Sequence, residues 1–213
     1  MLLRRLSSSQ VLTRIKVSEI LALSKALIKI GALQFGTFQL PSGKYTSFYI
    51  DLSNIPSFPS VFETCIELLR KRSKSLHFDA ICGIPFKGLP IASVLSFTLR
   101  KPLLYIRKES IISNSRFVEG TLRTGSTVLL VDDVVSSGNT LLEAAEKVRD
   151  EGYRVSDSLV LLDRVEGAKE LLRNSGLILN SVADVLQVAR VLVKYEVISK
   201  DKYRAILSEK KTV

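Results

Sequence analysis

The segment VLLVDDVVSSGNT, from Val128 to Thr140, decides the fold and organises the rest of the chain. Its first four residues form an apolar run, which is typical of a strand buried on both faces of a parallel sheet. We expect this strand to end at two carboxylates, Asp132 and Asp133. A turn of small residues follows, and after Thr140 the apolar residues recur at helical spacing. The segment therefore predicts a strand, a tight loop and the start of a helix.

A loop of this kind can bind a phosphate group. Backbone N–H groups at the start of a helix have no partner within the helix, and the helix dipole favours an anion there. Small side chains at Ser136, Ser137 and Gly138 let phosphate oxygens approach that backbone. The segment is neither a P-loop, which needs a lysine after its second glycine, nor a GxGxxG dinucleotide turn. Its acidic pair indicates a ligand that also carries hydroxyl groups or a cationic centre.

The composition is that of a soluble globular protein. A chain of 213 residues with 46% hydrophobic residues suits one domain, and no apolar run approaches the ~20 residues of a membrane span. Cys65 and Cys82 stand at no metal-binding spacing, so we interpret them as buried thiols in a reducing compartment, the cytoplasm. The net charge of +10 suits nucleic acid, an anionic surface or a polyanionic small molecule, and the charge alone does not choose among them. We do not expect nucleic-acid binding, because no basic block with interleaved aromatic residues occurs.

Strands and helices alternate along most of the chain, which predicts an α/β fold with a Rossmann-like parallel sheet flanked by helices. We expect a single domain over residues 1–213. About 17–55 would form an N-terminal helix and a small hood made by a hairpin, about 60–180 the α/β core, and about 181–210 the C-terminal helices. The last strand of the core is expected at Leu177–Leu179, and the last two helices at about Val182–Leu192 and Lys200–Leu207.

Four polar loops each follow an apolar strand. In open α/β sheets, ligands bind beyond the carboxyl ends of the strands, so these loops should converge on one crevice. This arrangement predicts a small-molecule site. The loops are Gly83–Gly88, Arg107–Glu119, Asp132–Thr140 and Asp163–Gly167.

Several motifs in order resemble the orotate phosphoribosyltransferases, which are type I phosphoribosyltransferases. The resemblance covers about residues 17–207. The motifs are the hairpin Phe35–Gly43 with Phe48–Asp51, the loop Cys82–Pro90, the frame of a catalytic loop at Ile106–Glu109 and Val118–Gly120, the acidic segment above, and the strand end Val160–Arg164. The resemblance implies an enzyme of pyrimidine biosynthesis that transfers the phosphoribosyl group of phosphoribosyl pyrophosphate (PRPP) to orotate, giving orotidine 5′-monophosphate and pyrophosphate.

The resemblance also implies roles for single residues. Asp132 and Asp133 would hold the ribose hydroxyls and face the positive charge that develops on the sugar, and Lys108 would reach the pyrophosphate from the catalytic loop. The implied PRPP-binding set is Phe86, Lys87, Arg107, Lys108, Asp132, Asp133, Val134, Val135, Ser136, Ser137, Gly138, Asn139 and Thr140. The implied orotate-binding set is Tyr49, Ser136 and Arg164, with the planar fork of Arg164 on the orotate carboxylate.

The implied cofactor is Mg²⁺, bound mainly through PRPP and water, with no certain direct protein ligand. The implied partners are a second copy of the chain, which would share the mobile loop across a homodimer interface, and an orotidylate decarboxylase. Purely structural roles stay open for several residues, and Arg107 and Lys108 could be ordinary charges at a strand end. Lys87 could be a solvated loop lysine, Tyr49 a core aromatic, and Arg164 a salt-bridge partner of Asp163 or Glu166.

The chain departs from the family pattern in its catalytic loop. Ile111 and Ser113 stand where a lysine and a histidine are usual, and Pro41 stands where the hairpin usually has a lysine, although Lys44 is near. A lost cation at the leaving group costs transition-state stabilisation unless another group, such as Arg116, supplies the charge. Two alternatives therefore stay open: a phosphoribosyltransferase for another nucleobase, and a PRPP- or nucleotide-sensing paralogue of low activity.

Overall fold

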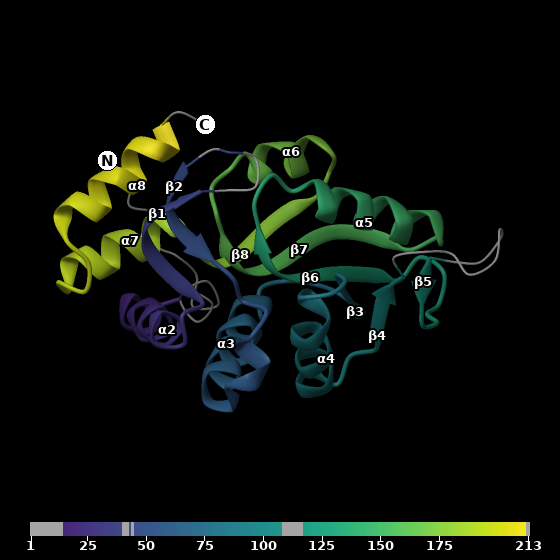
Figure 1. Ribbon diagram of the computed structural model, residues 1–213. Coiled ribbons are helices and arrows are strands. Elements are labelled where there is room, and N and C mark those ends of the chain that lie inside the picture. Colours follow the sequence, from purple (N-terminus) through teal and green to yellow (C-terminus); the bar gives the residue numbers. More distant parts are fainter. Residues whose placement is uncertain (1–14, 40–42, 44, 108–116, 212–213) are drawn as a thin grey trace, which may run out of the picture.

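The protein is built on a six-stranded sheet with helices on both faces (Figure 1). The structure, a computed structural model, describes residues 15–39, 43, 45–107 and 117–211. The sheet strands are β3 (Ala80–Gly83), β4 (Leu103–Ile106), β5 (Val118–Glu119), β6 (Thr127–Val135), β7 (Arg154–Asp163) and β8 (Ile178–Asp184). The helices are α2 (Val17–Lys29), α3 (Pro59–Ser73), α4 (Gly88–Leu99), α5 (Asn139–Asp150), α6 (Ala168–Asn174), α7 (Val185–Lys194) and α8 (Lys200–Lys211).

The strand order places a topological switch point beside the acidic segment. The order across the sheet is β5-β4-β3-β6-β7-β8, and all neighbouring pairs are parallel except β4 with β5. From β3 the chain first adds β4 on one side, and it later returns to add β6 on the other. The carboxyl ends of β3 and β6 therefore flank a crevice where open α/β sheets bind their ligands.

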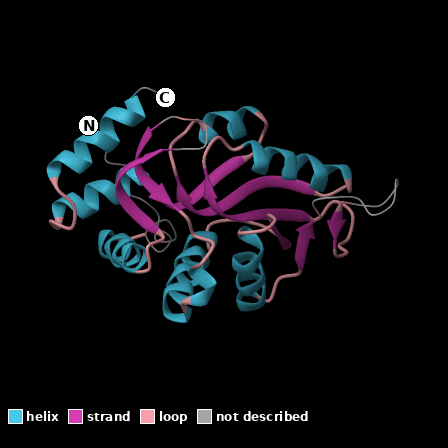
Figure 2. Ribbon diagram, in the orientation of Figure 1, coloured by secondary structure: helices cyan, strands magenta, loops and turns pink. Residues whose placement is uncertain are grey.

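Alternate side chains of the strands enter two cores. Ile81 of β3 and Leu129 of β6 pack on the face covered by α3 and α4, whereas Cys82 and Leu130 pack on the face covered by α5 and α6 (Figures 1 and 2). Successive side chains of a strand point to opposite faces, so a strand covered on both faces must be apolar throughout. This requirement explains the continuous apolar run that begins the acidic segment, and it confirms the expected α/β class.

The hairpin forms a separate two-stranded antiparallel sheet, as expected. Its strands are β1 (Leu33–Gln39) and β2 (Tyr45–Ile50), followed by the short 3₁₀ helix η1 (Ile55–Ser57). Helix α8 packs against β2 and buries Ile206 in the core, so the C-terminal helix connects the hood with the core (Figure 1).

Three expected boundaries are wrong. Strand β6 continues through Asp132 and Asp133 to Val135, because its backbone pairs with β7 as far as the register pair Val135 and Asp163. The phosphate loop is therefore shorter than predicted, and α5 already begins at Asn139. Strand β8 likewise pairs with β7 to Asp184, where the side chain of Asp184 caps α7. Residues Val182 to Asp184 are thus strand, not helix.

Two composition-based expectations bear on the interior and on membranes. Both cysteines are buried free thiols, as expected, and burial raises the pKa of each to about 12. Within the described ranges, no helix combines the length and the apolarity needed to cross a membrane.

Candidate active site

The phosphate loop joins β6 to α5 through three residues, Ser136 to Gly138. Gly138 adopts a left-handed backbone with φ +92°, and a Cβ there would lie 3.2 Å from the backbone of Ala168, so glycine is required. The two serines are exposed, and no side chain of the described residues caps the helix. The first N–H groups of α5 thus face a loop of small side chains, which is the geometry of an anion site.

The acidic pair lies directly before this loop. Asp132 Oδ1 accepts the Asp133 N–H at 2.8 Å, and Asp133 Oδ1 accepts the Val134 N–H at 2.8 Å. Asp133 is buried, yet its Oδ2 accepts no hydrogen bond from the described residues. A buried carboxylate oxygen without a partner is unfavourable, so this atom is suited to accept a hydrogen bond from a ligand hydroxyl.

Burial perturbs the titration of both acids. Loss of hydration raises the pKa of Asp132, and the neighbouring charge of Asp133 raises it further. Burial also raises the pKa of Asp133, although hydrogen bonds and the charge of Lys87 oppose this shift. A ligand that brings a positive centre to the pair would favour both ionised carboxylates.

Lys87 connects the loop after β3 with the hood. Its Nζ lies 2.9 Å from Oδ1 of Asp51, just after β2, and this hydrogen bond holds the pKa of Asp51 below its ordinary value. The same charge acts on Asp133. Lys87 is therefore paired with the hairpin, although its side chain is half-exposed.

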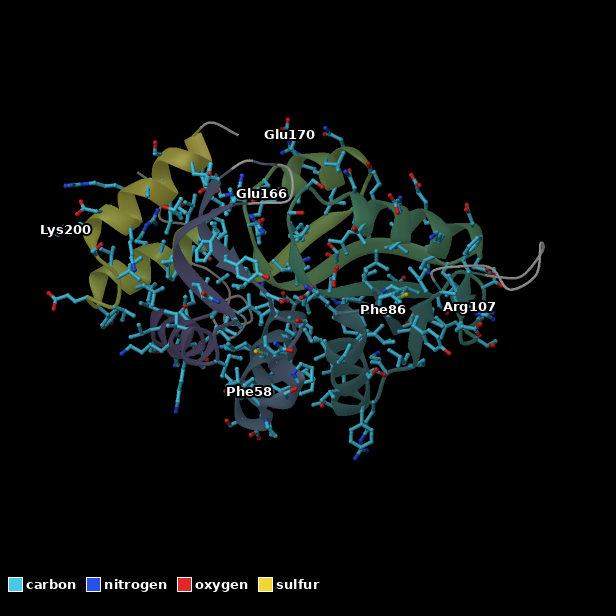
Figure 3. The ribbon with its side chains drawn as sticks, in the orientation of Figure 1. Phe58, Phe86, Arg107, Glu166, Glu170 and Lys200 are labelled. Atoms are coloured by element: carbon cyan, nitrogen blue, oxygen red, sulfur yellow. The ribbon has the colours of Figure 1, made fainter. Side chains whose placement is uncertain are left out.

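Arg107 lies at the carboxyl end of β4 and forms an ion pair with Glu119 of β5. Figure 3 shows it toward the β5 edge of the sheet, with Phe86, which is exposed, nearer the centre. The ion pair closes the base of the hairpin from which the expected catalytic loop extends. Lys108, Ile111, Ser113 and Arg116 of that loop lie outside the described residues, as do Pro41 and Lys44.

Arg164 lies beside the phosphate loop at the end of β7. Its backbone N–H donates to the Val135 carbonyl at 2.9 Å. In its side chain, Nε donates to Glu166 Oε1 at 3.0 Å, and the guanidinium carbon lies 5.2 Å from the ring centroid of Phe48. The following residue, Val165, has φ +58°, a strained conformation for a β-branched side chain that a functional turn can retain. Arg164 therefore forms the expected salt bridge to Glu166, and it also lies next to the phosphate loop.

Tyr49 is not a core aromatic. Its side chain is 40% exposed and its ring packs on Phe38 with centroids 5.8 Å apart, whereas the neighbouring Phe48 is completely buried. Tyr49 thus has exposed ring surface that a planar ligand could contact.

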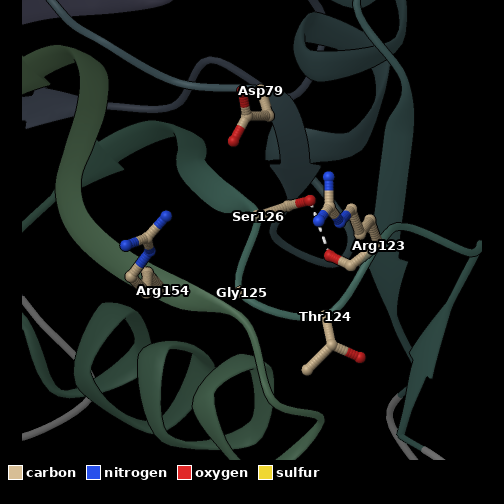
Figure 4. A pocket seen from close by; sticks show the side chains of 6 residues that line it. All are labelled: Asp79, Arg123, Thr124, Gly125, Ser126 and Arg154. Carbon is tan, nitrogen blue, oxygen red and sulfur yellow. Dashed lines mark hydrogen bonds between the residues drawn. The ribbon is translucent and has the colours of Figure 1, made fainter.

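A cavity of about 430 Å³ lies at the amino ends of the parallel strands, opposite the phosphate loop (Figure 4). Asp79, Ser126 and Arg154, which line it, stand at the amino ends of β3, β6 and β7. Because open α/β sheets bind ligands beyond the carboxyl ends of their strands, we do not place the substrate in this cavity.

Comparison with known proteins identifies the family. Residues 51–176 match the model of the phosphoribosyl transferase domain. The orotate phosphoribosyltransferase of Sulfolobus acidocaldarius is 36% identical over 183 residues, which cover 85% of this chain and 92% of that protein. This chain belongs to the orotate phosphoribosyltransferase family.

Solved structures and longer relatives agree with this assignment. The crystal structure of the orotate phosphoribosyltransferase from Aeropyrum pernix superimposes with a TM-score of 0.72 at 36% identity, over 83% of this chain and 99% of that one. The uridine 5′-monophosphate synthase of Bos taurus is 37% identical over 80% of this chain, but the match spans only 36% of the bovine protein. The match thus spans nearly the whole Aeropyrum pernix chain but only about a third of the bovine enzyme.

The structure adds residues to the family site that sequence reasoning missed. Asp51 pairs with Lys87, and Glu119 pairs with Arg107. Both acids lie inside motifs that resemble the family, so the sequence could have indicated them as candidate site residues. Gly88 was missed as a packing residue. A Cβ at Gly88 would lie 2.7 Å from Asp132 Oδ1, so only glycine lets α4 begin against the acidic pair.

Proposed function

We propose that this phosphoribosyltransferase joins PRPP and orotate to form orotidine 5′-monophosphate and pyrophosphate, through the residues assembled above. One observation carries the assignment. The backbone N–H of Arg164 donates to the Val135 carbonyl, and this bond supports a base half-site next to the strand that ends in the phosphate loop. Two half-sites, for a phosphorylated sugar and for a carboxylated base, therefore lie side by side.

Each half-site has a separate task in this reaction. The N–H groups and hydroxyls of residues 136–140 bind the 5′-phosphate, and Asp132 and Asp133 bind the ribose hydroxyls. As the bond to pyrophosphate breaks, the sugar gains positive charge, which the two carboxylates stabilise. The negative charge on the leaving group is faced by Lys87, Arg107 and Lys108. To bind it, Lys87 must leave Asp51 and Arg107 must leave Glu119.

The base half-site selects orotate through one charge and one ring. Arg164 pairs with the orotate carboxylate, and the exposed face of Tyr49 lies against the pyrimidine. Ser136 reaches the base from the phosphate loop. Arg164 is held by Glu166 and by the ring of Phe48, so its guanidinium is oriented before the substrate arrives.

The decisive assay follows the ultraviolet absorbance of orotate in the presence of PRPP and Mg²⁺. The wild type should consume orotate, and Arg164→Met should raise the orotate KM by at least ~30-fold, because truncating one partner of a charge pair costs about 2–5 kcal/mol. Arg173→Met, at an exposed arginine of α6, is the matched control. Consumption of another base from a panel of purines and pyrimidines, with orotate unchanged, would refute the assignment.

Mg²⁺ is proposed as the cofactor, held mainly by the substrate. No cluster of three or more histidine, cysteine, aspartate or glutamate side chains in the described ranges could hold a metal ion. The pyrophosphate oxygens of PRPP and water supply the oxygen ligands that Mg²⁺ prefers, while the acidic pair adds negative charge nearby. Omitting Mg²⁺ from the assay should abolish turnover, and adding it back should restore it.

A homodimer is proposed through the outer face of α4. No charged residue occurs from Gly88 to Leu99, yet Val94 and Phe97 on this helix are 38% and 86% exposed, and Tyr105 of the adjacent β4 is also exposed. An uncharged apolar face of this kind favours burial against a second copy. Light scattering should give a dimer for the wild type and for Tyr195→Asp, but a monomer for Phe97→Asp; a dimeric Phe97→Asp would exclude this face.

Two further proposals concern the cellular setting. Two buried reduced thiols support a cytoplasmic location. The match to only part of the bovine uridine 5′-monophosphate synthase supports a working association with an orotidylate decarboxylase, which would consume the product.

A further inference from the structure

The last turn of α8 is hydrogen-bonded to the hood. The carboxylate of Glu209 accepts the Thr46 hydroxyl at 2.9 Å and both the N–H and the hydroxyl of Ser47 at 2.7 Å. These bonds hold the pKa of Glu209 below its ordinary value despite its partial burial. The C-terminal helix is therefore attached to the strand that carries Phe48 and Tyr49.

The next residue, Lys210, reaches the loop of the orotate arginine. Its side chain is only 3% exposed, and its Nζ lies 2.9 Å from Glu166 Oε1 and 4.9 Å from the ring centroid of Phe48. Arg164 donates to the same oxygen and stacks on the same ring. Two cations thus share one carboxylate and one aromatic ring, although α8 and the β7–α6 loop are far apart in the sequence.

Burying the Lys210 ammonium group costs free energy of solvation, so a need to fill space does not explain why a lysine stands at this position. A lysine leaves water only when its charge is paired, and an apolar side chain of similar size would fill the same space without this cost. The charge, however, has a local consequence at Glu166. Glu166 accepts hydrogen bonds from both Lys210 and Arg164. Among the described residues, the guanidinium of Arg164 donates a side-chain hydrogen bond only through its Nε. No hydrogen bond to another described residue occupies its terminal nitrogens, so they can receive a ligand carboxylate.

We propose that Lys210 is a positioning residue for the base half-site. It fixes Glu166, and through Glu166 and Phe48 it holds the guanidinium of Arg164 in the orientation that receives the orotate carboxylate. The end of the C-terminal helix thereby sets the affinity for the base. This role rests on the proposed function, in which Arg164 binds orotate.

The test compares Lys210→Met with Lys210→Arg and with Lys202→Met, an exposed lysine on the same helix. Lys210→Met should raise the orotate KM about tenfold, which corresponds to ~1.4 kcal/mol, and leave kcat and the PRPP KM within about twofold. The effect falls on KM because the carboxylate contact is made equally in the ground and transition states. Lys210→Arg should restore most of the affinity, and Lys202→Met should match the wild type.

A double-mutant cycle with Glu166→Gln tests the route of the effect. If Lys210 acts through Glu166, the two substitutions together should raise the orotate KM less than the product of their separate effects. Independent, multiplicative effects would overturn this route. An unchanged orotate KM in Lys210→Met, or equal rises in both KM values with a large fall in Tm, would overturn the positioning role alone. A wild type that consumes no orotate would overturn the proposed function and this role with it.

Discussion

Replacing Gly88 with alanine should injure the PRPP half-site through a steric clash at its centre. Gly88 begins α4 directly against Val131 and Asp132 of β6. An added Cβ would lie 2.7 Å from both the Val131 carbonyl oxygen and Asp132 Oδ1, and 2.8 Å from the Asp132 Cα. Ordinary contact with a Cβ begins at 3.4 Å, so the new methyl group would be about 0.7 Å too close to backbone atoms.

The energetic cost follows from what can move. Strand β6 is hydrogen-bonded to β3 on one side and to β7 on the other, so it cannot give way. Helix α4 must shift instead, and overpacking of this kind costs about 1–3 kcal/mol. For a chain of this length each kcal/mol lowers Tm by roughly 2–4 °C, which predicts a fall of about 2–12 °C. The displaced Asp132 carboxylate should also raise the PRPP KM more than the orotate KM.

The matched control is Gly36→Ala in β1, where the nearest atoms to an added Cβ are ring carbons of Phe38 at 3.6 Å. Both variants lose the same glycine entropy in the unfolded chain, so their difference isolates the clash. Thermal unfolding and steady-state kinetics at fixed orotate would measure it. Equal Tm values and an unchanged PRPP KM in Gly88→Ala would refute the reasoning.

Three other predictions concern charge, backbone conformation and the catalytic loop. Burial raises the pKa of Asp132 above its ordinary 3.8, so the native state keeps a proton that the unfolded chain loses. The unfolding free energy of the wild type should fall as pH rises from about 4 toward 8, by up to ~1.4 kcal/mol per pH unit. Inactive Asp132→Asn should lose part of this dependence in urea titrations, and an equal slope would contradict it. Glu196→Gly should raise the unfolding free energy by about 0.5–1 kcal/mol, because Glu196 follows α7 with φ +57°, a conformation that glycine adopts without strain. The control Lys202→Gly, inside α8, should lower the unfolding free energy by about 1 kcal/mol. Thermal unfolding of both variants tests this, and a lower Tm for Glu196→Gly would contradict it. Ile111→Lys should raise kcat by restoring a cation near the leaving group, and an unchanged kcat would mean that another residue already supplies the charge.

The sequence by itself determined the class of fold and the local order of the acidic segment. Apolar runs alternating with helical periodicity specify strands covered on both faces, and Asp132, Asp133 and the small residues from Ser136 to Gly138 are adjacent in the chain. Local order is enough for such a motif, because one strand, one turn and one helix start bring its parts together. The hairpin and the position of Arg164 at a strand end were predicted for the same reason.

Only the tertiary structure decided how far the strands run and which charges meet. β6 continues through the acidic pair because β7 offers hydrogen-bond partners as far as Asp163, a fact of pairing that no local pattern contains. Lys87 meets Asp51, and Lys210 meets Glu166, across 36 and 44 residues of sequence. Periodicity reports which face of an element is buried, but it does not report which distant side chain shares that space, so these contacts depend on the folded chain.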